Sequence, residues 1–314
     1  MQKDKKVLIS IARRYYMDGH SQQEIAKEFG ISRPTVSNVL KKCRESGIVQ
    51  IKIEDSFPYS TAVGDQLKKR FALEDAIIVS TKTDQSITKD VGSVAGEYAT
   101  SLLTEGIKIG IAWGTSLYHM VQHLPQRAIK NSSVVQLMGG FGAALPQYDG
   151  SELAREFSRR IKSSYYPLQC PVIVNNVVVK EYLLKELGIQ ETLKQTKNLD
   201  LAFVGISSNY PNQSAMVRAQ FISEEEAKEI QMAGAVGHIC GYSYDADGNL
   251  LDISYNKRII GIDFEDFLKV PKRVGVAYGI QKAEAIKCAL KANHITTLIT
   301  DEVTAKQIIK LSDK

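Results

Sequence analysis

The chain of 314 residues is long enough for two or three domains rather than one small core. Apolar residues make up 44% and charged residues 24%, a globular balance that excludes an intrinsically disordered chain. Residues 1–56 hold 11 Lys and Arg against 7 Asp and Glu, a net of +4, out of a formal charge of +5 for the whole chain. The surplus of positive charge therefore lies at the amino-terminal end, where contacts with phosphates would use it.

The cysteines, the first residues and the hydropathy exclude several further classes. Cys43, Cys170, Cys240 and Cys288 lie far apart and form no CxxC pair, which argues against zinc ligation and against a disulfide framework. The first six residues are too polar for a signal peptide, and no apolar run approaches the length of a membrane span. We expect a cytoplasmic protein that uses no metal or other cofactor and has no membrane partner.

The first predicted elements form a helix-turn-helix. Residues 5–17 carry apolar side chains at helical spacing and predict a first helix. Ser21 precedes a second helix with Glu24 three residues later, which is the spacing of a capping box. Gly30 supplies a tight turn, and Ser32 is placed to cap a third helix.

Polar side chains remain on the open face of the third helix. Arg and Asn can bond in bidentate fashion to guanine and adenine edges, and Ser or Thr can reach phosphates or bases. An ordinary helical hairpin with a polar outer face is the alternative, but cap, glycine and short polar face in this order favour DNA binding. The candidate DNA-binding residues are Ser21, Gln22, Ser32, Arg33, Thr35, Ser37, Asn38 and Lys41.

A wing and a connector follow. Alternating apolar and polar residues at 48–53 predict a strand, so residues 1–56 are expected to form a winged helix-turn-helix domain. Phe57 and Pro58 mark a boundary, after which residues 62–71 predict a short amphipathic helix. This helix is either a connector or a dimerisation helix. Residues 57–314 are expected to form the second, effector-binding and oligomerisation domain.

Strands alternate with helices through the second domain, which predicts an α/β fold with a doubly wound, largely parallel sheet. Helices are expected at 91–103, 116–124 and 152–161. Strands are expected at 76–80, 108–113, 133–138, 171–174, 199–204, 274–277 and 296–299.

Loops of Gly, Ser and Thr follow three of these strands. Ligands of open α/β sheets bind at the carboxyl ends of the strands, where backbone N–H groups of a helix start can face an anion. The loops at 113–116, 138–141 and 204–208 therefore predict a polar pocket of the size of a phosphate. By spacing alone, Lys282 fits a phosphate partner and a surface lysine equally well. His238, in a predicted polar turn, is more simply a structural residue, and Thr300 or Asp301 a helix cap.

The whole chain resembles the SorC family of bacterial transcriptional regulators. The resemblance rests on Tyr15-Tyr16 and on the segments 21–40, 110–116, 139–140, 200–207, 236–247 and 298–302. It implies a winged helix-turn-helix joined to a sugar-binding domain similar to ribose-5-phosphate isomerase and glucosamine-6-phosphate deaminase. It also implies tetramers, and phosphorylated sugars as effectors, with the phosphate on loop 114–116 and Lys282. For this chain we expect a homo-oligomer, either a dimer or a tetramer.

Three positions depart from the family pattern. The family often has an acidic residue in place of His238, positioned to accept bonds from sugar hydroxyls. The family usually has Gly-Gly before the loop that carries the lysine, whereas this chain has Tyr278-Gly279. The larger side chain narrows the predicted pocket on that side. Met138 precedes Gly139, so no amine at that point could form a Schiff base with an effector aldehyde. The individual sugar therefore stays open.

The predicted function is a sequence-specific repressor of a carbohydrate or nucleoside catabolic operon, without enzymatic activity. Its expected partners are a double-stranded DNA operator, a phosphorylated sugar and further copies of itself. A sugar-phosphate isomerase or deaminase with a DNA-binding appendage is the rival, with His238, Asp301 and Glu302 as candidate bases. A ligand-free architectural DNA-binding protein is a third interpretation. The candidate effector-binding residues are Gly114, Thr115, Ser116, Gly139, Gly140, Phe141, Gly205, Ser207, Ser208, His238 and Lys282.

Overall fold

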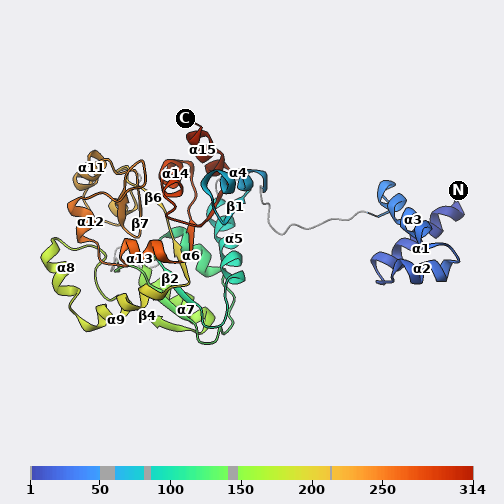
Figure 1. Ribbon diagram of the computed structural model, residues 1–314, viewed down its shortest axis with the longest axis horizontal. Coiled ribbons are helices and arrows are strands. Elements are labelled where there is room, and N and C mark those ends of the chain that lie inside the picture. Colours follow the sequence, from blue (N-terminus) through green and yellow to red (C-terminus); the bar gives the residue numbers. More distant parts are fainter. Residues whose placement is uncertain (1, 50–60, 81–85, 141–147, 213, 314) are drawn as a thin grey trace. The chain divides into compact units, whose positions relative to one another are not determined.

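The computed structural model describes residues 2–49, 61–80, 86–140, 148–212 and 214–313 (Figure 1). The chain divides into two compact units, residues 1–56 and 57–314. Within the described residues, no helix combines the length and the apolar character needed to cross a membrane. Of the predicted wing, residues 48 and 49 are not in a strand, and residues 50–53 lie outside the described part of the chain.

The amino-terminal unit contains the helices α1 (Gln2–Tyr16), α2 (Gln22–Phe29) and α3 (Arg33–Glu45). The predicted capping box is present, because Ser21 Oγ accepts from Glu24 N at 3.3 Å while the Glu24 carboxylate accepts from Ser21 N at 2.8 Å. Gly30 ends α2 in the left-handed conformation, with φ at +64°, as the predicted tight turn requires. Ser32 caps α3 by accepting from Thr35 N.

A small apolar core holds these three helices together. Ile11 of α1, Ile25 of α2, and Val36 and Leu40 of α3 are buried against one another. Burial of this set fixes the angle between α2 and α3, and it leaves the opposite face of α3 in solvent.

The second unit is built on a seven-stranded sheet in which every neighbouring pair is parallel, which confirms the predicted α/β fold. All residues of the central strands are buried apart from a few at their beginnings, so helices cover both faces. The spatial order is β1 (Asp75–Val79), β10 (Thr297–Asp301), β9 (Lys272–Val276), β5 (Leu201–Val204), β2 (Lys108–Ile111), β3 (Ser133–Gln136) and β4 (Ser164–Tyr166).

The strand order reverses direction between β2 and β5. From β2 the chain moves outward through β3 to β4, whereas from β5 it moves outward on the other side through β9 to β10. Neighbouring strands whose following connections diverge in this way leave a crevice at their carboxyl ends. The fold therefore places a binding crevice after β2 and β5.

Two predictions about strands are wrong. Residues 171–174 belong to no strand and form only isolated bridges, Gly140 with Pro171 and Ile173 with Ile259, although Val172 and Val174 are buried as a strand's apolar residues would be. The expected polar turn around His238 is instead a buried strand of a second, antiparallel sheet. That sheet consists of β6 (Ser207–Ser208), β7 (Gly237–Ile239) and β8 (Tyr242–Tyr244).

Helices of the second unit begin and end within a few residues of the predicted helices where both exist. Several shorter helices were not predicted, because fewer than two turns carry little periodicity. The helices are α4 (Thr61–Phe71), α5 (Ile87–Ser101), α6 (Thr115–Gln122), α7 (Gly150–Ile161), α8 (Val177–Leu183), α9 (Leu187–Gln195), α10 (Ala215–Arg218), α11 (Glu224–Met232), α12 (Ser254–Arg258), α13 (Phe264–Lys269), α14 (Ala283–Lys291) and α15 (Glu302–Ser312).

Helices α5 and α6 pack unusually closely through two glycines. A Cβ at Gly92 would lie 2.3 Å from the Cβ of His119, and a Cβ at Gly96 would lie 2.6 Å from the Cβ of His123. Real Cβ atoms do not approach so closely, so the backbones of the two helices depend on glycine at both positions.

Gly92→Ala should therefore destabilise the protein. We expect the free energy of unfolding to fall by about 2 kcal/mol, because overpacking outweighs the gain in helix propensity. Gly188→Ala in α9, where no atom lies within 4 Å of the added Cβ, is the matched control and should stabilise by about 0.5–1 kcal/mol. Urea denaturation of both variants measures the difference, and equal stability would contradict the close packing.

Candidate functional site

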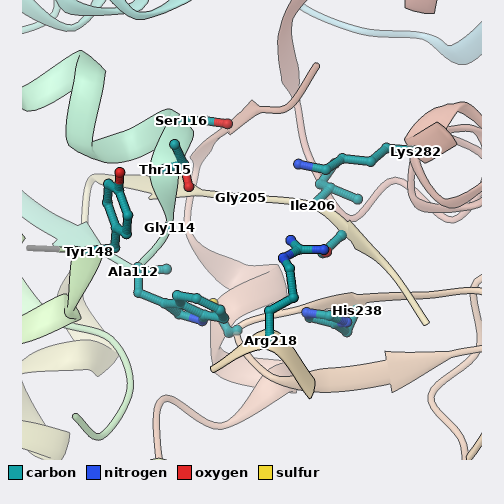
Figure 2. A pocket seen from close by; sticks show the side chains of 13 residues that line it. Ala112, Gly114, Thr115, Ser116, Tyr148, Gly205, Ile206, Arg218, His238 and Lys282 are labelled. Atoms are coloured by element: carbon teal, nitrogen blue, oxygen red, sulfur yellow. The ribbon is translucent and has the colours of Figure 1, made fainter. Parts of the chain in front are cut away.

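A cavity of about 490 Å³ opens at the carboxyl ends of β2 and β5, at the point where the strand order reverses (Figure 2). Its walls come from the loop after β2, the loop after β5 and segments near the second sheet. The lining residues are Ala112, Trp113, Gly114, Thr115, Ser116, Tyr148, Gly205, Ile206, Ser207, Arg218, His238, Cys240 and Lys282.

One end of the cavity is the start of α6. Gly114 caps this helix with φ at +127°, a conformation that suits glycine, and Thr115 and Ser116 follow in the first turn. Backbone N–H groups of a first helical turn have no partner within the helix and attract anions. Ser116 is buried, and its hydroxyl interacts with the hydroxyl of Tyr278.

Two cations line the cavity from other elements. Arg218 is the last residue of α10, and Lys282 ends the 3-10 turn Ile280–Lys282 (Figure 2). Burial, together with the charge of Arg218, lowers the pKa of the Lys282 amine to about 8. No Asp or Glu is among the described lining residues, so a bound anion would be attracted without competition from a neighbouring carboxylate.

His238 lies at the other end, on β7, directly opposite Ser207 of β6. Its Nδ1 is 2.6 Å from Oδ1 of Asn209, whose amide nitrogen donates to Ser243 Oγ at 2.7 Å. Burial, together with the charges of Lys282 and Arg218, lowers the pKa of His238 to about 4. The imidazole is therefore neutral at pH 7.

The carboxylates of the other two candidate bases, Asp301 and Glu302, form hydrogen bonds or an ion pair within the protein. Asp301 caps α15, accepting from Thr304 N at 2.9 Å and from Gly279 N at 3.0 Å, so the predicted cap is confirmed. Glu302 pairs with Lys306 at 2.7 Å and accepts from Ser80 at 2.9 Å. Neither carboxylate lines the cavity.

In the amino-terminal unit, most of the candidate DNA-binding side chains are exposed on α3. The hydroxyls of Ser21 and Ser32 serve as helix caps, and Gln22 is half-buried. Lys41 lies 3.9 Å from Glu45, and both side chains are exposed. The solvent-facing residues of α3 and its cap are Ser32, Arg33, Thr35, Ser37, Asn38 and Lys41.

Residues 56–310 match a family described as "Putative sugar-binding domain", and residues 10–52 match one described as "Helix-turn-helix domain". The chain is 31% identical over 312 residues to the deoxyribonucleoside regulator of Bacillus subtilis (strain 168), which covers 98% of this chain and 99% of that relative. The full-length sorbitol operon regulator SorC from Klebsiella pneumoniae superposes with a TM-score of 0.76 at 27% identity, covering 98% of this chain and 99% of that one. The chain belongs to the SorC family of bacterial transcriptional regulators.

This SorC-family regulator is also 28% identical over 313 residues to the curated sorbitol operon regulator of Klebsiella pneumoniae, with 98% of each chain covered. The relatives share both parts of the chain, so the protein joins a DNA-binding helix-turn-helix to a sugar-binding domain. It is a transcriptional regulator.

The cavity brings together seven of the eleven residues predicted for the effector: Gly114, Thr115, Ser116, Gly205, Ser207, His238 and Lys282.

Gly139, Gly140 and Ser208 do not line the cavity, and Phe141 lies outside the described residues. Gly139 is packed against the carbonyl of Pro171, where a Cβ would lie 2.4 Å from the oxygen, so its role is close packing. Ser208 Oγ accepts from the backbone N–H of Tyr210 and is occupied within the protein.

Several lining residues were missed by sequence reasoning. Trp113 precedes the Gly114 loop, and its place at a strand end was a usable signal. No sequence signal pointed to Arg218, Tyr148 or Cys240. Arg218 belongs to α10, which has only four residues, and Tyr148 and Cys240 lie in irregular or very short elements. Their positions depend on tertiary packing.

The low pKa of Lys282 generates a prediction about pH. A phosphomonoester such as ribose 5-phosphate is a dianion above about pH 6, so only the protein changes charge at higher pH. With a pKa of about 8, Lys282 is charged at pH 7 and largely neutral at pH 9, which should weaken binding about tenfold over this interval. Calorimetric titration measures this, and Lys282→Met should bind weakly with no such slope. A wild-type affinity independent of pH would contradict the contact.

The exposed face of α3 generates a prediction about DNA. Arg33→Ala should lower affinity for a selected operator by about 1–3 kcal/mol and relax the sequence preference, if its guanidinium bonds a base edge. Arg33→Lys is the matched control, because it keeps the charge but lacks the planar fork. Selection from random duplex DNA followed by anisotropy titration tests both variants. An equal loss on operator and random DNA would make Arg33 a phosphate contact.

Proposed function

We propose that this regulator is a repressor of a carbohydrate or nucleoside catabolic operon, controlled by a phosphorylated sugar that binds in the cavity. Residues 1–56 would bind the operator in the cytoplasm, and residues 57–314 would bind the effector and join copies of the chain into dimers or tetramers. The observation that carries the proposal is the pairing of the α6 start with Arg218 and Lys282, without a carboxylate in the described lining.

The location and size of the cavity support a small phosphorylated ligand. A volume of about 490 Å³ is in the range of pockets for small molecules, and the position at a topological switch is where such sheets bind ligands. Trp113 and Ile206 add apolar surface against which a carbon skeleton can pack. The names of the relatives, a deoxyribonucleoside regulator and a sorbitol operon regulator, support carbohydrate or nucleoside metabolism as the controlled process.

Neither of the two carboxylates considered as candidate bases lines the cavity, which argues against turnover of the sugar. Among the described lining residues, His238 is the candidate base, and a pKa of about 4 makes it a weak proton acceptor near neutral pH. Asp301 and Glu302 are engaged elsewhere. We therefore propose a binding role for the cavity and no enzymatic activity.

Control of DNA binding needs only differential affinity. An effector that binds one quaternary arrangement about 100-fold more tightly than another shifts their equilibrium by roughly 2.7 kcal/mol. A dimer or tetramer would contact a roughly two-fold operator through half-sites that lie whole helical turns apart. For a repressor, the sugar phosphate would favour the arrangement that does not fit these half-sites.

The double variant Thr115→Val/Ser116→Ala tests the site. It removes two hydroxyls from the first turn of α6, so the stabilisation by sugar phosphates and their effect on operator binding should be lost while DNA binding itself remains. The matched control is Thr100→Val/Ser101→Ala, which removes one Thr and one Ser hydroxyl at the carboxyl end of α5. Neither residue lines the cavity, so this variant should respond as wild type. Thermal shift and anisotropy give the two readouts. A retained response in the first variant would place the phosphate elsewhere.

A further inference from the structure

Tyr278 connects the starts of two helices. It follows β9 after one intervening residue, and it is half-buried without lining the cavity. Its hydroxyl forms hydrogen bonds with the side chains of Thr88, in the first turn of α5, and of Ser116, in the first turn of α6. Because α5 follows β1 and α6 follows β2 in a parallel sheet, both helices start at the carboxyl edge of that sheet. The phenol group therefore lies directly behind the end of the cavity where backbone N–H groups attract an anion.

The ring of the same residue supports the amine of Lys282. The Lys282 Nζ lies 5.5 Å from the centroid of the Tyr278 ring, which is within the range of a cation–π interaction. Figure 2 shows this amine pointing toward the side chains of Thr115 and Ser116. Since burial lowers the pKa of Lys282 to about 8, its charge is poorly solvated, and a π face is worth more to it than to a surface lysine. The ring therefore favours the charged form of Lys282.

The three hydroxyls of Thr88, Tyr278 and Ser116 form a row in which each has one proton to donate. Burial raises the pKa of the Tyr278 phenol, so this group keeps its proton. With an anion at the start of α6, the favoured order is donation from Thr88 to Tyr278, from Tyr278 to Ser116, and from Ser116 to the anion. Every O–H dipole then points toward the negative charge, and hydrogen bonds in such a chain polarise one another. The Tyr278 hydroxyl thus makes Ser116 a better donor.

We propose that Tyr278 is a positioning residue for the anion-binding end of the cavity. Its hydroxyl directs the hydroxyl of Ser116 toward the anion, and its ring holds the ammonium group of Lys282 at the opposite wall. This inference rests on the proposed function, because the anion is the phosphate of the effector. It adds a residue outside the cavity lining, which acts on the ligand through Ser116 and Lys282.

The protonation of Lys282 can be followed separately from that of its neighbours. The other titratable groups of the described lining are Arg218 of α10, His238 of β7, Tyr148 and Cys240. Arg218 stays charged at every pH used, and His238, with a pKa of about 4, is neutral above about pH 6. Burial raises the pKa of the Cys240 thiol to about 12. Two carboxylates of the adjoining segments, Glu284 and Asp301, accept hydrogen bonds from other groups of the protein.

The role of the ring is tested on the full chain without ligand. Competitive acetylation at a series of pH values, followed by mass spectrometry, gives the midpoint at which the Lys282 amine loses its proton. Tyr278→Leu keeps an apolar side chain but has no π face, so its midpoint should lie about 0.5–1 pH unit below that of the wild type. Tyr278→Phe keeps the ring and should leave the midpoint unchanged. An unchanged midpoint in Tyr278→Leu, or an equal decrease in Tyr278→Phe, would overturn the contact with the ring.

The role of the hydroxyl is tested by calorimetry at pH 7 with ribose 5-phosphate and inorganic phosphate. Tyr278→Phe should weaken both about three- to fivefold, because the Ser116 hydroxyl loses its donor. In a Ser116→Ala background the same change should have no effect, whereas in a Thr115→Val background it should again weaken binding about three- to fivefold. A general structural effect of the missing hydroxyl would give equal losses in both backgrounds, and that result would overturn the row of hydrogen bonds.

Tyr165→Phe is the matched control for both experiments. The hydroxyl of Tyr165 also bonds within the protein, donating to Ser151 O at 3.0 Å, and Tyr165 does not line the cavity. This variant should equal the wild type in the midpoint of Lys282 and in both affinities.

The outcomes separate the role of Tyr278 from the proposed function. If both phosphates bind the wild type and Tyr278→Phe binds them equally well, the positioning by the hydroxyl is overturned while the proposed function stands. If neither phosphate binds the wild type at about 10 mM, the proposed phosphate site is overturned, and the positioning role with it.

Discussion

The structure depends on the side-by-side placement of β2 and β5 in a parallel sheet from which their following segments diverge. This arrangement leaves a crevice at the carboxyl ends of the two strands, and the loops that follow them and the amino terminus of α6 lie around it. The helical dipole, the hydroxyls and the cations that gather there come from segments far apart in the sequence. None of them would form a site without the strand order.

Burial then determines how these groups behave. Lys282 is far enough from water for its pKa to fall to about 8, and His238, deeper still, has a pKa of about 4. The same low polarity therefore leaves the Lys282 amine charged only below about pH 8, and it keeps the His238 imidazole neutral at pH 7. An anion that enters the cavity restores favourable surroundings for the lysine charge, so ligand binding and protonation are linked.

The sequence was most informative where structure is local or strongly periodic. Ser21, Glu24 and Gly30 specify caps and a turn within a few residues of themselves, and the structure confirms each of them. Six of the seven parallel strands were also accessible as buried apolar runs near predicted helices, whereas β4, which has only three residues, was not predicted. The second sheet and Arg218 were not, since strands of two or three residues and a four-residue helix have no measurable period. The strand predicted at residues 171–174 was wrong because an apolar segment can be buried in the core without pairing with a neighbouring strand.

The glycine-lined contact between α5 and α6 has a mechanical consequence. With backbone so close at Gly92 and Gly96, there is no layer of flexible side chains to absorb a relative displacement. α6 begins at the cavity with Thr115. A displacement of the start of α6 would consequently be transmitted to α5, because the two helices are packed too closely to slide over one another.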